Sequence, residues 1–228
     1  MKRSRINSLI RHAESFFAEH RFQLPPFGRW TPDQWRARGR DADEIRQKCL
    51  GWDLTDFGQG NFEQLGLLLF TIRNGVPGDP DNAKCYAEKI MIVRELQITP
   101  WHFHWTKVED IINRGGGNLV VELAWATPDE NALDKHDVAV SCDGVTHTVS
   151  SGGKVTLGTG QSITLPPKLY HKFYGEQGAG TVLVGEVSKT NDDRTDNRFL
   201  DGMGRFPRIE EDEAPYRLLC TEYLPARE

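Results

Sequence analysis

The pattern of hydrophobic and polar positions follows a helical period at the start of the chain. Six apolar side chains between residues 6 and 17 recur at spacings of three and four, which lines one face of a helix. They are Ile6, Leu9, Ile10, Ala13, Phe16 and Phe17. We therefore predict an amphipathic helix that ends near His20.

Shorter helices should follow this first one. The residues Thr-Pro-Asp-Gln at 31–34 place a capping threonine, a proline at the first helical position and a glutamine three residues after the threonine. Another helix is predicted from about Asp43 to Leu50, closed by Gly51. The apolar cluster between residues 62 and 74 is ambiguous between a buried strand and a helix, and its Asn-Gly end signals a turn.

From residue 86 onward the period becomes that of strands. Residues 86–105 and 118–125 are rich in strand-forming side chains. Residues 138–165 consist of short runs broken by Asp-Gly, Gly-Gly and Gly-Thr-Gly, which is the pattern of successive hairpins. A further hairpin is predicted over residues 171–188, with its turn around residues 178–180.

This spacing of strands predicts a mainly β fold, an antiparallel sandwich or barrel. We expect residues 1–75 to form an α-helical N-terminal extension packed on a barrel of residues 76–228, in one structural domain. Residues 189–228 carry many charged side chains without a clear period, and we expect long ordered loops that wrap the barrel.

Composition and charge narrow the classes of function. The 28 Lys and Arg residues against 33 Asp and Glu residues leave a net charge of -5, which argues against a nucleic-acid partner held through phosphates. No apolar run approaches the roughly 18 residues that span a bilayer, so no membrane association is expected. The four cysteines are scattered and no signal peptide is evident, which favours the cytoplasm.

The stretch WHFHWTKVED at residues 101–110 contains candidate metal ligands. On a strand, His102 and His104 point to the same side, so both imidazoles can share one ligand. Glu109 lies past a predicted bend, and its carboxylate can return to the same centre. His171 begins a later strand after a proline-stiffened turn, and a barrel would bring that strand beside the first.

These residues resemble the two motifs of the cupin superfamily. The pattern H-x-H-x4-E-x6-G begins at His102 and is similar to the first motif, and G-x5-P-x-K-x2-H ends at His171 and is similar to the second. Lys168 replaces the usual glycine of the second motif, a position that shapes a turn. The resemblance implies a cupin-type β-barrel, also called a jelly roll, with a metal bound by three histidines and one glutamate.

A closer resemblance covers nearly all of the chain. Residues 86–117, 186–200 and 204–223 resemble the D-lyxose isomerases, cupin-fold aldose-ketose isomerases that bind a divalent metal, commonly Mn²⁺. This resemblance implies a sugar substrate, with interconversion of D-lyxose and D-xylulose and a plausible second pair, D-mannose and D-fructose. It also suggests a homodimer.

The chemistry of such a reaction agrees with these residues. Moving a carbonyl from C1 to C2 of a sugar requires loss of the C2 proton, an enediolate and reprotonation at C1. A divalent metal chelated by O1 and O2 stabilises the developing negative charge. Three imidazoles and one carboxylate leave two adjacent positions open on an octahedral ion. The same donors suit Mn²⁺, Fe²⁺, Co²⁺, Ni²⁺ or Zn²⁺, so the choice of Mn²⁺ depends on the resemblance.

Proton transfer needs further side chains. Lys107 is a candidate to polarise O1 or to move the hydroxyl proton, with a pKa lowered by a nearby metal, and Glu186 is the candidate base for C2 and C1. Other polar residues can contact sugar hydroxyls, two on a strand and four in the tail. They are Lys89 and Gln97, and Asp193, Arg194, Asn197 and Arg205.

Other interpretations of these residues stay open. Lys107 can be solvated at a strand end, and Glu186 can be salt-bridged in the barrel wall. The same four ligands suit a cupin dioxygenase that uses ferrous iron, or a sugar-binding cupin without turnover. The isomerase is the favoured hypothesis.

Overall fold

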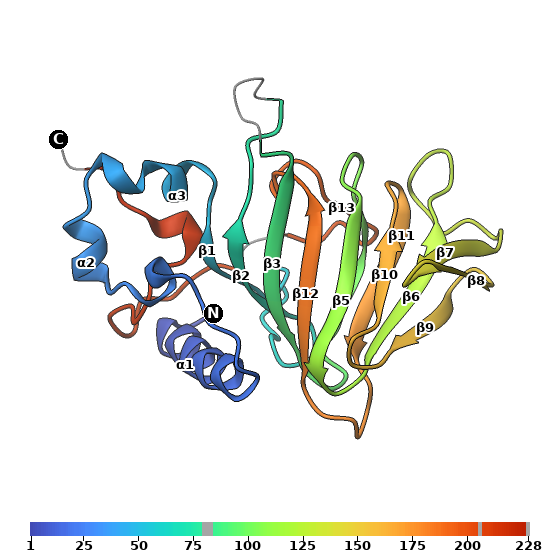
Figure 1. Cartoon of the computed structure of the whole chain (residues 1–228), viewed down its shortest axis with the longest axis horizontal. Coiled ribbons are helices and arrows are strands. Elements are labelled where there is room, and N and C mark those ends of the chain that lie inside the picture. Colours follow the sequence, from blue (N-terminus) through green and yellow to red (C-terminus); the bar gives the residue numbers. More distant parts are fainter. Residues whose placement is uncertain (79–83, 205–206, 227–228) are drawn as a thin grey trace.

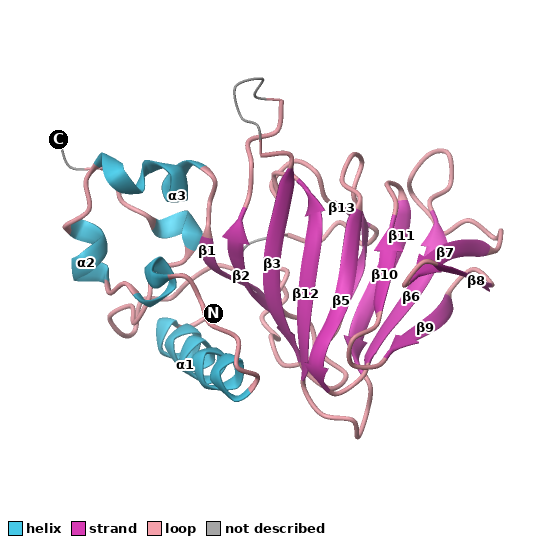
Figure 2. Ribbon diagram, viewed as in Figure 1, coloured by secondary structure: helices cyan, strands magenta, loops and turns pink. Residues whose placement is uncertain are grey.

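The computed structural model describes residues 1–78, 84–204 and 207–226. These residues form two antiparallel sheets that face each other, with the helices gathered beside one end of the sandwich (Figures 1 and 2). The larger sheet has the order β1 (Gly51–Thr55), β2 (Leu67–Arg73), β3 (Tyr86–Val93), β12 (Val182–Lys189), β5 (Glu109–Gly116), β10 (Ser162–Leu165), β7 (Val138–Cys142) and β8 (Val145–Val149). The smaller has the order β13 (Arg198–Phe199), β4 (Thr99–Phe103), β11 (Leu169–Gly175), β6 (Leu119–Trp125) and β9 (Gly153–Leu157).

The predicted fold class is confirmed: the protein is mainly β, with a jelly-roll arrangement and an N-terminal helix. The main core lies between the sheets, because alternate side chains of each strand point inward. Met91 and Val184 from the larger sheet belong to one buried cluster with Leu123 and Phe173 from the smaller sheet. Each large apolar side chain buried in this way contributes about 1.5–3 kcal/mol.

A second core explains the apolar run that was ambiguous in the sequence. In β2, Leu67 and Leu69 face the core between the sheets, whereas Leu68 and Phe70 belong to a cluster with α1 (Arg3–Glu19). The strand is therefore buried on both faces, and such strands lose the alternation of apolar and polar residues. Phe17 of α1 lies in this second cluster.

The helices largely follow their sequence signals. The helix α1 covers the predicted range, and α2 (Pro32–Arg36) begins at a capping box in which Thr31 and Gln34 exchange hydrogen bonds. The helix α3 (Asp43–Gln47) ends three residues before the predicted Leu50. The chain then enters β1 at Gly51, a strand that the sequence did not predict. The larger sheet thus begins before the predicted boundary at residue 75.

The predicted series of hairpins was wrong at two places. The Asp143-Gly144 turn does join paired strands, β7 and β8. The next strand, β9, pairs with β6 in the smaller sheet, and β10 returns to the larger sheet beside β5. Likewise β11 and β12, predicted as a hairpin, belong to opposite sheets. Glycine turns reveal where a strand ends but not which sheet the next strand joins, and in a jelly roll consecutive strands often cross over.

The tail consists mostly of loops, as expected, and returns to the N-terminal helix. The described part of residues 190–226 contains β13 and the short 3-10 helix η3 (Cys220–Glu222). Arg3, whose side chain is 2% exposed, donates hydrogen bonds to Glu211 at 2.6 and 2.9 Å and to Glu222. These two carboxylates raise the pKa of Arg3, so its charge is retained at the point where α1 and the tail meet.

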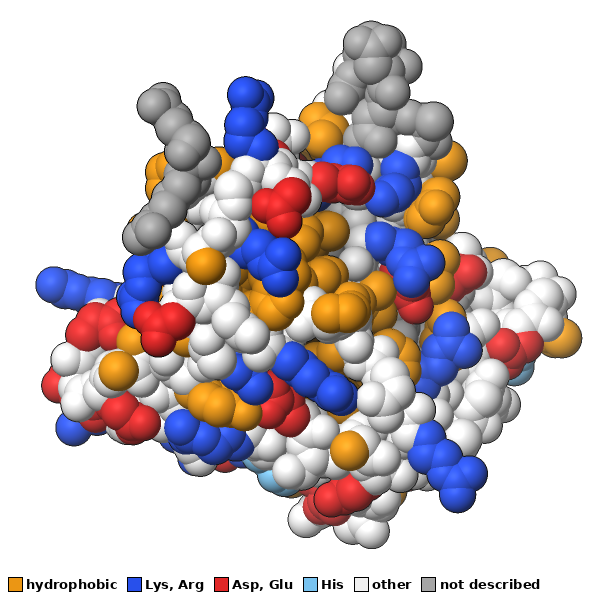
Figure 3. All heavy atoms as spheres, turned by 60° about the vertical axis from the view of Figure 1, so that its left-hand side comes forward, with side chains coloured by type: hydrophobic (Ala, Val, Ile, Leu, Met, Phe, Trp, Pro, Cys, Tyr) orange, Lys and Arg blue, Asp and Glu red, His pale blue; other side chains and the backbone are white. Residues whose placement is uncertain are grey.

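The surface agrees with the modest net charge. On the face shown in Figure 3, acidic and basic side chains are interspersed around an apolar centre. Among the described residues, no helix has the length and apolarity needed to cross a membrane.

Replacing Arg3 by alanine should lower the free energy of unfolding by roughly 2 kcal/mol, because the charged hydrogen bonds to Glu211 and Glu222 are lost. Urea denaturation of the purified variant measures this. Arg5→Ala is the matched control: Arg5 and its partner Glu63 have side chains 43% and 54% exposed, so a change below about 0.5 kcal/mol is expected. An Arg3→Ala protein as stable as the control would show that the tail docks without this contact.

Candidate metal centre

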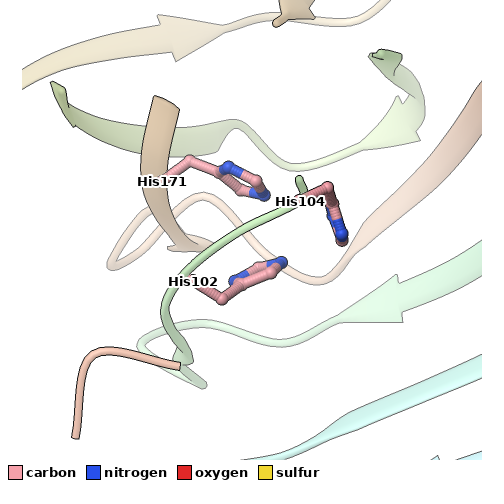
Figure 4. Close-up of side chains that lie close together, drawn as sticks. All are labelled: His102, His104 and His171. Carbon is pink, nitrogen blue, oxygen red and sulfur yellow. The ribbon is translucent and has the colours of Figure 1, made fainter. Parts of the chain in front are cut away.

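Neighbouring strands of the smaller sheet bring three histidines together. His102 of β4 and His171 of β11 are directly paired across the two strands, and His104 follows the end of β4. One ring nitrogen of each lies within 4.8 Å of one in each of the others, and all three residues are buried. Figure 4 shows the three rings turned toward a common point. The predicted meeting of these residues is thus present in the structure.

Backbone carbonyls set the orientation of the three rings. In each histidine Nδ1 lies at hydrogen-bond distance from a carbonyl oxygen, which makes Nδ1 the protonated nitrogen and leaves the Nε2 lone pair available for a metal. The pairs are His102 with Pro100 at 2.8 Å, His104 with Asp196 at 2.7 Å and His171 with Leu169 at 3.0 Å. This is the arrangement that supports imidazole ligands in metal sites.

The fourth candidate ligand comes from the opposite sheet. Glu109 is the first residue of β5, and its Oε1 lies 3.3 Å from His104 Nε2 and 3.1 Å from His171 Nε2. The contact to His171 lacks hydrogen-bond alignment, so this buried Nε2 has no hydrogen-bond partner among the described residues. A buried nitrogen of this kind is costly unless something binds it. Three imidazole nitrogens and one carboxylate fit a divalent transition metal.

Electrostatics keep these groups in the protonation states that a metal requires. Burial lowers the pKa of His102 well below its usual value, and the neighbouring imidazoles lower it further. Burial and the Lys107 ammonium likewise lower the pKa of His104. Burial alone would raise the pKa of Glu109, but the Lys107 ammonium holds it well below its usual value. The centre therefore combines neutral imidazoles at His102 and His104 with an ionised carboxylate at Glu109.

Lys107 lies inside the site and is not solvated at a strand end. Its Nζ is 2.6 Å from Glu109 Oε2 and 3.0 Å from Glu186 Oε1. Burial would lower the pKa of Lys107, but the carboxylates of Glu109, Glu186 and Asp193 outweigh burial and raise it. The lowered pKa that the sequence analysis expects for Lys107 beside a bound metal stays a prediction, and the three carboxylates act against it. Lys107 is an ammonium group, a donor of hydrogen bonds.

A row of alternating charges extends from the histidines across the larger sheet. Glu186 of β12 accepts from Lys107 and lies 3.3 Å from Lys89 Nζ of β3, and Lys89 donates to both oxygens of Asp193 at 3.1 Å. The order is Glu109, Lys107, Glu186, Lys89 and Asp193. Each charge has a neighbour of opposite sign, which makes their burial tolerable. Glu186 is thus ion-paired in the wall of the larger sheet, and it also lines the cavity at the histidines.

A cavity of about 40 Å³ lies beside this row. Lys89, Asp193 and Asn197 line it, together with Lys107 and Glu186. A second cavity of about 250 Å³ shares Lys89 and Asp193 as lining residues. The predicted sugar-contacting residues from β3 and from the tail therefore converge next to the histidines.

Three other predicted contacts have different placements. Arg194 is bidentately paired with Asp192, at 2.8 and 2.9 Å, and lines the second cavity. Gln97 turns away from the histidines, because its amide donates to the Phe62 carbonyl oxygen at 2.6 Å. Arg205 lies outside the described residues.

Asp196 is a structural partner of the centre that the sequence analysis missed, although it lies within the cluster NDDRTDN at residues 191–197. Its backbone carbonyl orients His104. Its carboxylate accepts from the backbone N–H groups of residues 105, 106 and 107 at 2.9–3.1 Å. The tail is thereby fastened to the loop that carries His104 and Lys107.

Comparison with known proteins adds the family. The sequence profile of D-lyxose isomerase matches residues 1–223. The D-lyxose/D-mannose isomerase of Escherichia coli O157:H7 is 50% identical over 228 residues, covering 100% of both chains. That of Serratia proteamaculans is 51% identical over 225 residues, covering 98% of both.

Solved structures support the fold. The L-ribose isomerases of Cellulomonas parahominis and of Acinetobacter sp. DL28 align with TM-scores of 0.57 and 0.58, each over 92% of this chain and 98% of their own. Their sequence identities are 17% and 16%, so this likeness concerns the fold alone.

Asp196→Asn should weaken binding of a divalent ion about 10–100-fold, because an amide group would face backbone N–H donors and release the His104 loop. Isothermal titration of metal-stripped protein with Mn²⁺ measures the affinity. Asp201→Asn, which changes an exposed carboxylate of the same tail, is the control and should bind as the unmodified protein does. Equal affinities for the two variants would remove Asp196 from the support of the centre.

Proposed function

The chain belongs to the D-lyxose isomerase family, and we propose that it interconverts D-lyxose with D-xylulose and D-mannose with D-fructose through an enediol. The single observation that supports this reaction is the row of alternating charges from Glu109 to Asp193, which lies beside the histidines and contains acidic and basic groups able to exchange protons. The names of two relatives at about half identity support the choice of sugars.

We propose that His102, His104, His171 and Glu109 hold a divalent ion, most simply Mn²⁺. The oriented imidazoles and the unpartnered nitrogen of His171 support this assignment. When bound, such an ion supplies a Lewis acid that stabilises negative charge on the oxygens of the enediol. The protein's own groups perform the remaining steps.

Glu186 is proposed as the base that removes the C2 proton and returns it to C1. Lys107 and the Ser188 hydroxyl each donate a hydrogen bond of 3.0 Å to its Oε1, and these bonds fix the orientation of the carboxylate. Lys107, kept protonated by its carboxylate neighbours, donates a hydrogen bond to a sugar oxygen and moves the hydroxyl proton. The two roles are complementary because acid and base touch each other at the site.

Lys89, Asp193 and Asn197 are proposed to bind sugar hydroxyls, with Arg194 near the far end of the substrate. D-mannose is longer than D-lyxose by one CH(OH) unit. The second cavity, which shares Lys89 and Asp193 with the first, offers room for that extension. The homodimer and the cytoplasmic location expected from the sequence stay predictions.

Metal-stripped protein supplied with Mn²⁺ should convert D-lyxose and D-mannose to ketoses, and a chelator should abolish this. Ketose formation is followed across a panel of pentoses and hexoses, with and without oxygen. Undiminished activity without oxygen separates the isomerase from a dioxygenase that uses the same ligands. If no ketose formed from any of the aldoses, the proposed function would be overturned. Sugar binding without turnover would favour a binding protein.

Glu186→Gln should reduce kcat by about 10²–10⁴-fold, the usual contribution of a general base, with Mn²⁺ affinity changed only a few-fold. Glu88→Gln, on the neighbouring strand β3 and paired with Arg73, is the control and should keep its activity. In heavy water the unmodified protein should place deuterium at C1 of the ketose. A Glu186→Gln protein with normal kcat would contradict this role.

A further inference from the structure

A one-residue register shift in β4 changes which side chains face the site. Phe173 of β11 pairs with Thr99, whereas His171 pairs with His102, so three residue steps on β4 match two on β11. In a regular strand, residues three apart point to opposite faces. Here Thr99 and His102 line the same cavity, because the irregularity at Pro100 and Trp101 turns both side chains inward.

The hydroxyl of Thr99 is not used by the fold. The residue is 2% exposed, and its Oγ1 has no hydrogen-bond partner among the described residues. A buried hydroxyl without a partner destabilises a protein. Valine has nearly the same shape and would fill the position without that penalty, so packing alone gives no reason for the oxygen atom.

The surroundings of this hydroxyl suit a ligand. Phe57, Phe173 and Phe199 line the same cavity, and apolar walls strengthen any hydrogen bond formed among them. The hydroxyl shares the cavity with the proposed acid and base, Lys107 and Glu186. Thr99, Lys107 and Glu186 therefore border one and the same space.

We infer that Thr99 is a specificity-determining residue, whose hydroxyl hydrogen-bonds a sugar hydroxyl beyond the reacting C1 and C2 carbons. This inference rests on the proposed function. A site built to pair a substrate hydroxyl rejects compounds that lack it, because the buried protein group is then left unsatisfied. Thr99 adds this selectivity on the side of the cavity formed by the smaller sheet, opposite the charged row.

Thr99→Val tests the inference, since it removes the hydroxyl and keeps the volume. The kcat/KM for D-lyxose should fall about 10–100-fold, mainly through KM, as expected for loss of one buried hydrogen bond to the substrate. Thr99→Ser, which restores the hydroxyl, should recover most of it. The Tm of the sugar-free, Mn²⁺-loaded Thr99→Val protein should stay equal or rise.

Two results would overturn the inference. Unchanged kcat/KM in Thr99→Val would show that the hydroxyl does not contact the sugar, and a lowered Tm without sugar would show that it supports the fold. Both readings require that the unmodified protein be active. An inactive unmodified protein counts against the proposed function itself, so the two failures are distinguishable.

Discussion

The contact on which the site depends is the meeting of Glu109, from the larger sheet, with imidazoles carried by the smaller sheet. It places a charge in the interior of the sandwich, where an unpaired charge is expensive. The ion pairs of the alternating row, from Glu109 to Asp193, offset that cost. Its three carboxylates and two ammonium groups leave one negative charge uncompensated, which favours the binding of a cation at the histidines. The candidate metal ligands and the candidate proton-transfer groups are therefore parts of one electrostatically coupled unit.

The rest of the fold holds the two sides of this unit in place. The apolar core between the sheets sets their separation, and the second core fastens α1 to the outside of β2 and β3. The tail connects both regions, since one part of it binds Arg3 and another part, through Asp196, binds the loop that carries His104. A change in the tail can thus reach the centre through the hydrogen bond between Asp196 and His104 and through the bonds from the Asp196 carboxylate to the backbone of the same loop.

Features that depend only on residues close in the sequence were predicted correctly. The period of α1, the capping box at Thr31 and the shared side of His102 and His104 needed only neighbours in the sequence. Sheet membership of β9 to β12 could not be predicted, because it depends on distant pairing. The direction of the Gln97 side chain could not be predicted for a related reason. The alternation that it was expected to share with Lys89 ends where β3 ends, at residue 93, and the chain then turns.

The protonation of Lys107 shows the same limit. Its sequence neighbours include one carboxylate, but Glu186 and Asp193 come from far along the chain, and together these carboxylates raise the pKa of Lys107. Thr99 is hidden for a geometric reason, since a one-residue irregularity inverts the parity that the sequence implies. Among the described residues four buried side-chain atoms lack a hydrogen-bond partner; two of them, on His171 and Thr99, lie at the candidate centre, and the others are on Arg46 and Asn191. The atoms on His171 and Thr99 cost stability in the protein alone, which the apolar cores must offset, and under the proposed function they gain partners when ion and sugar bind.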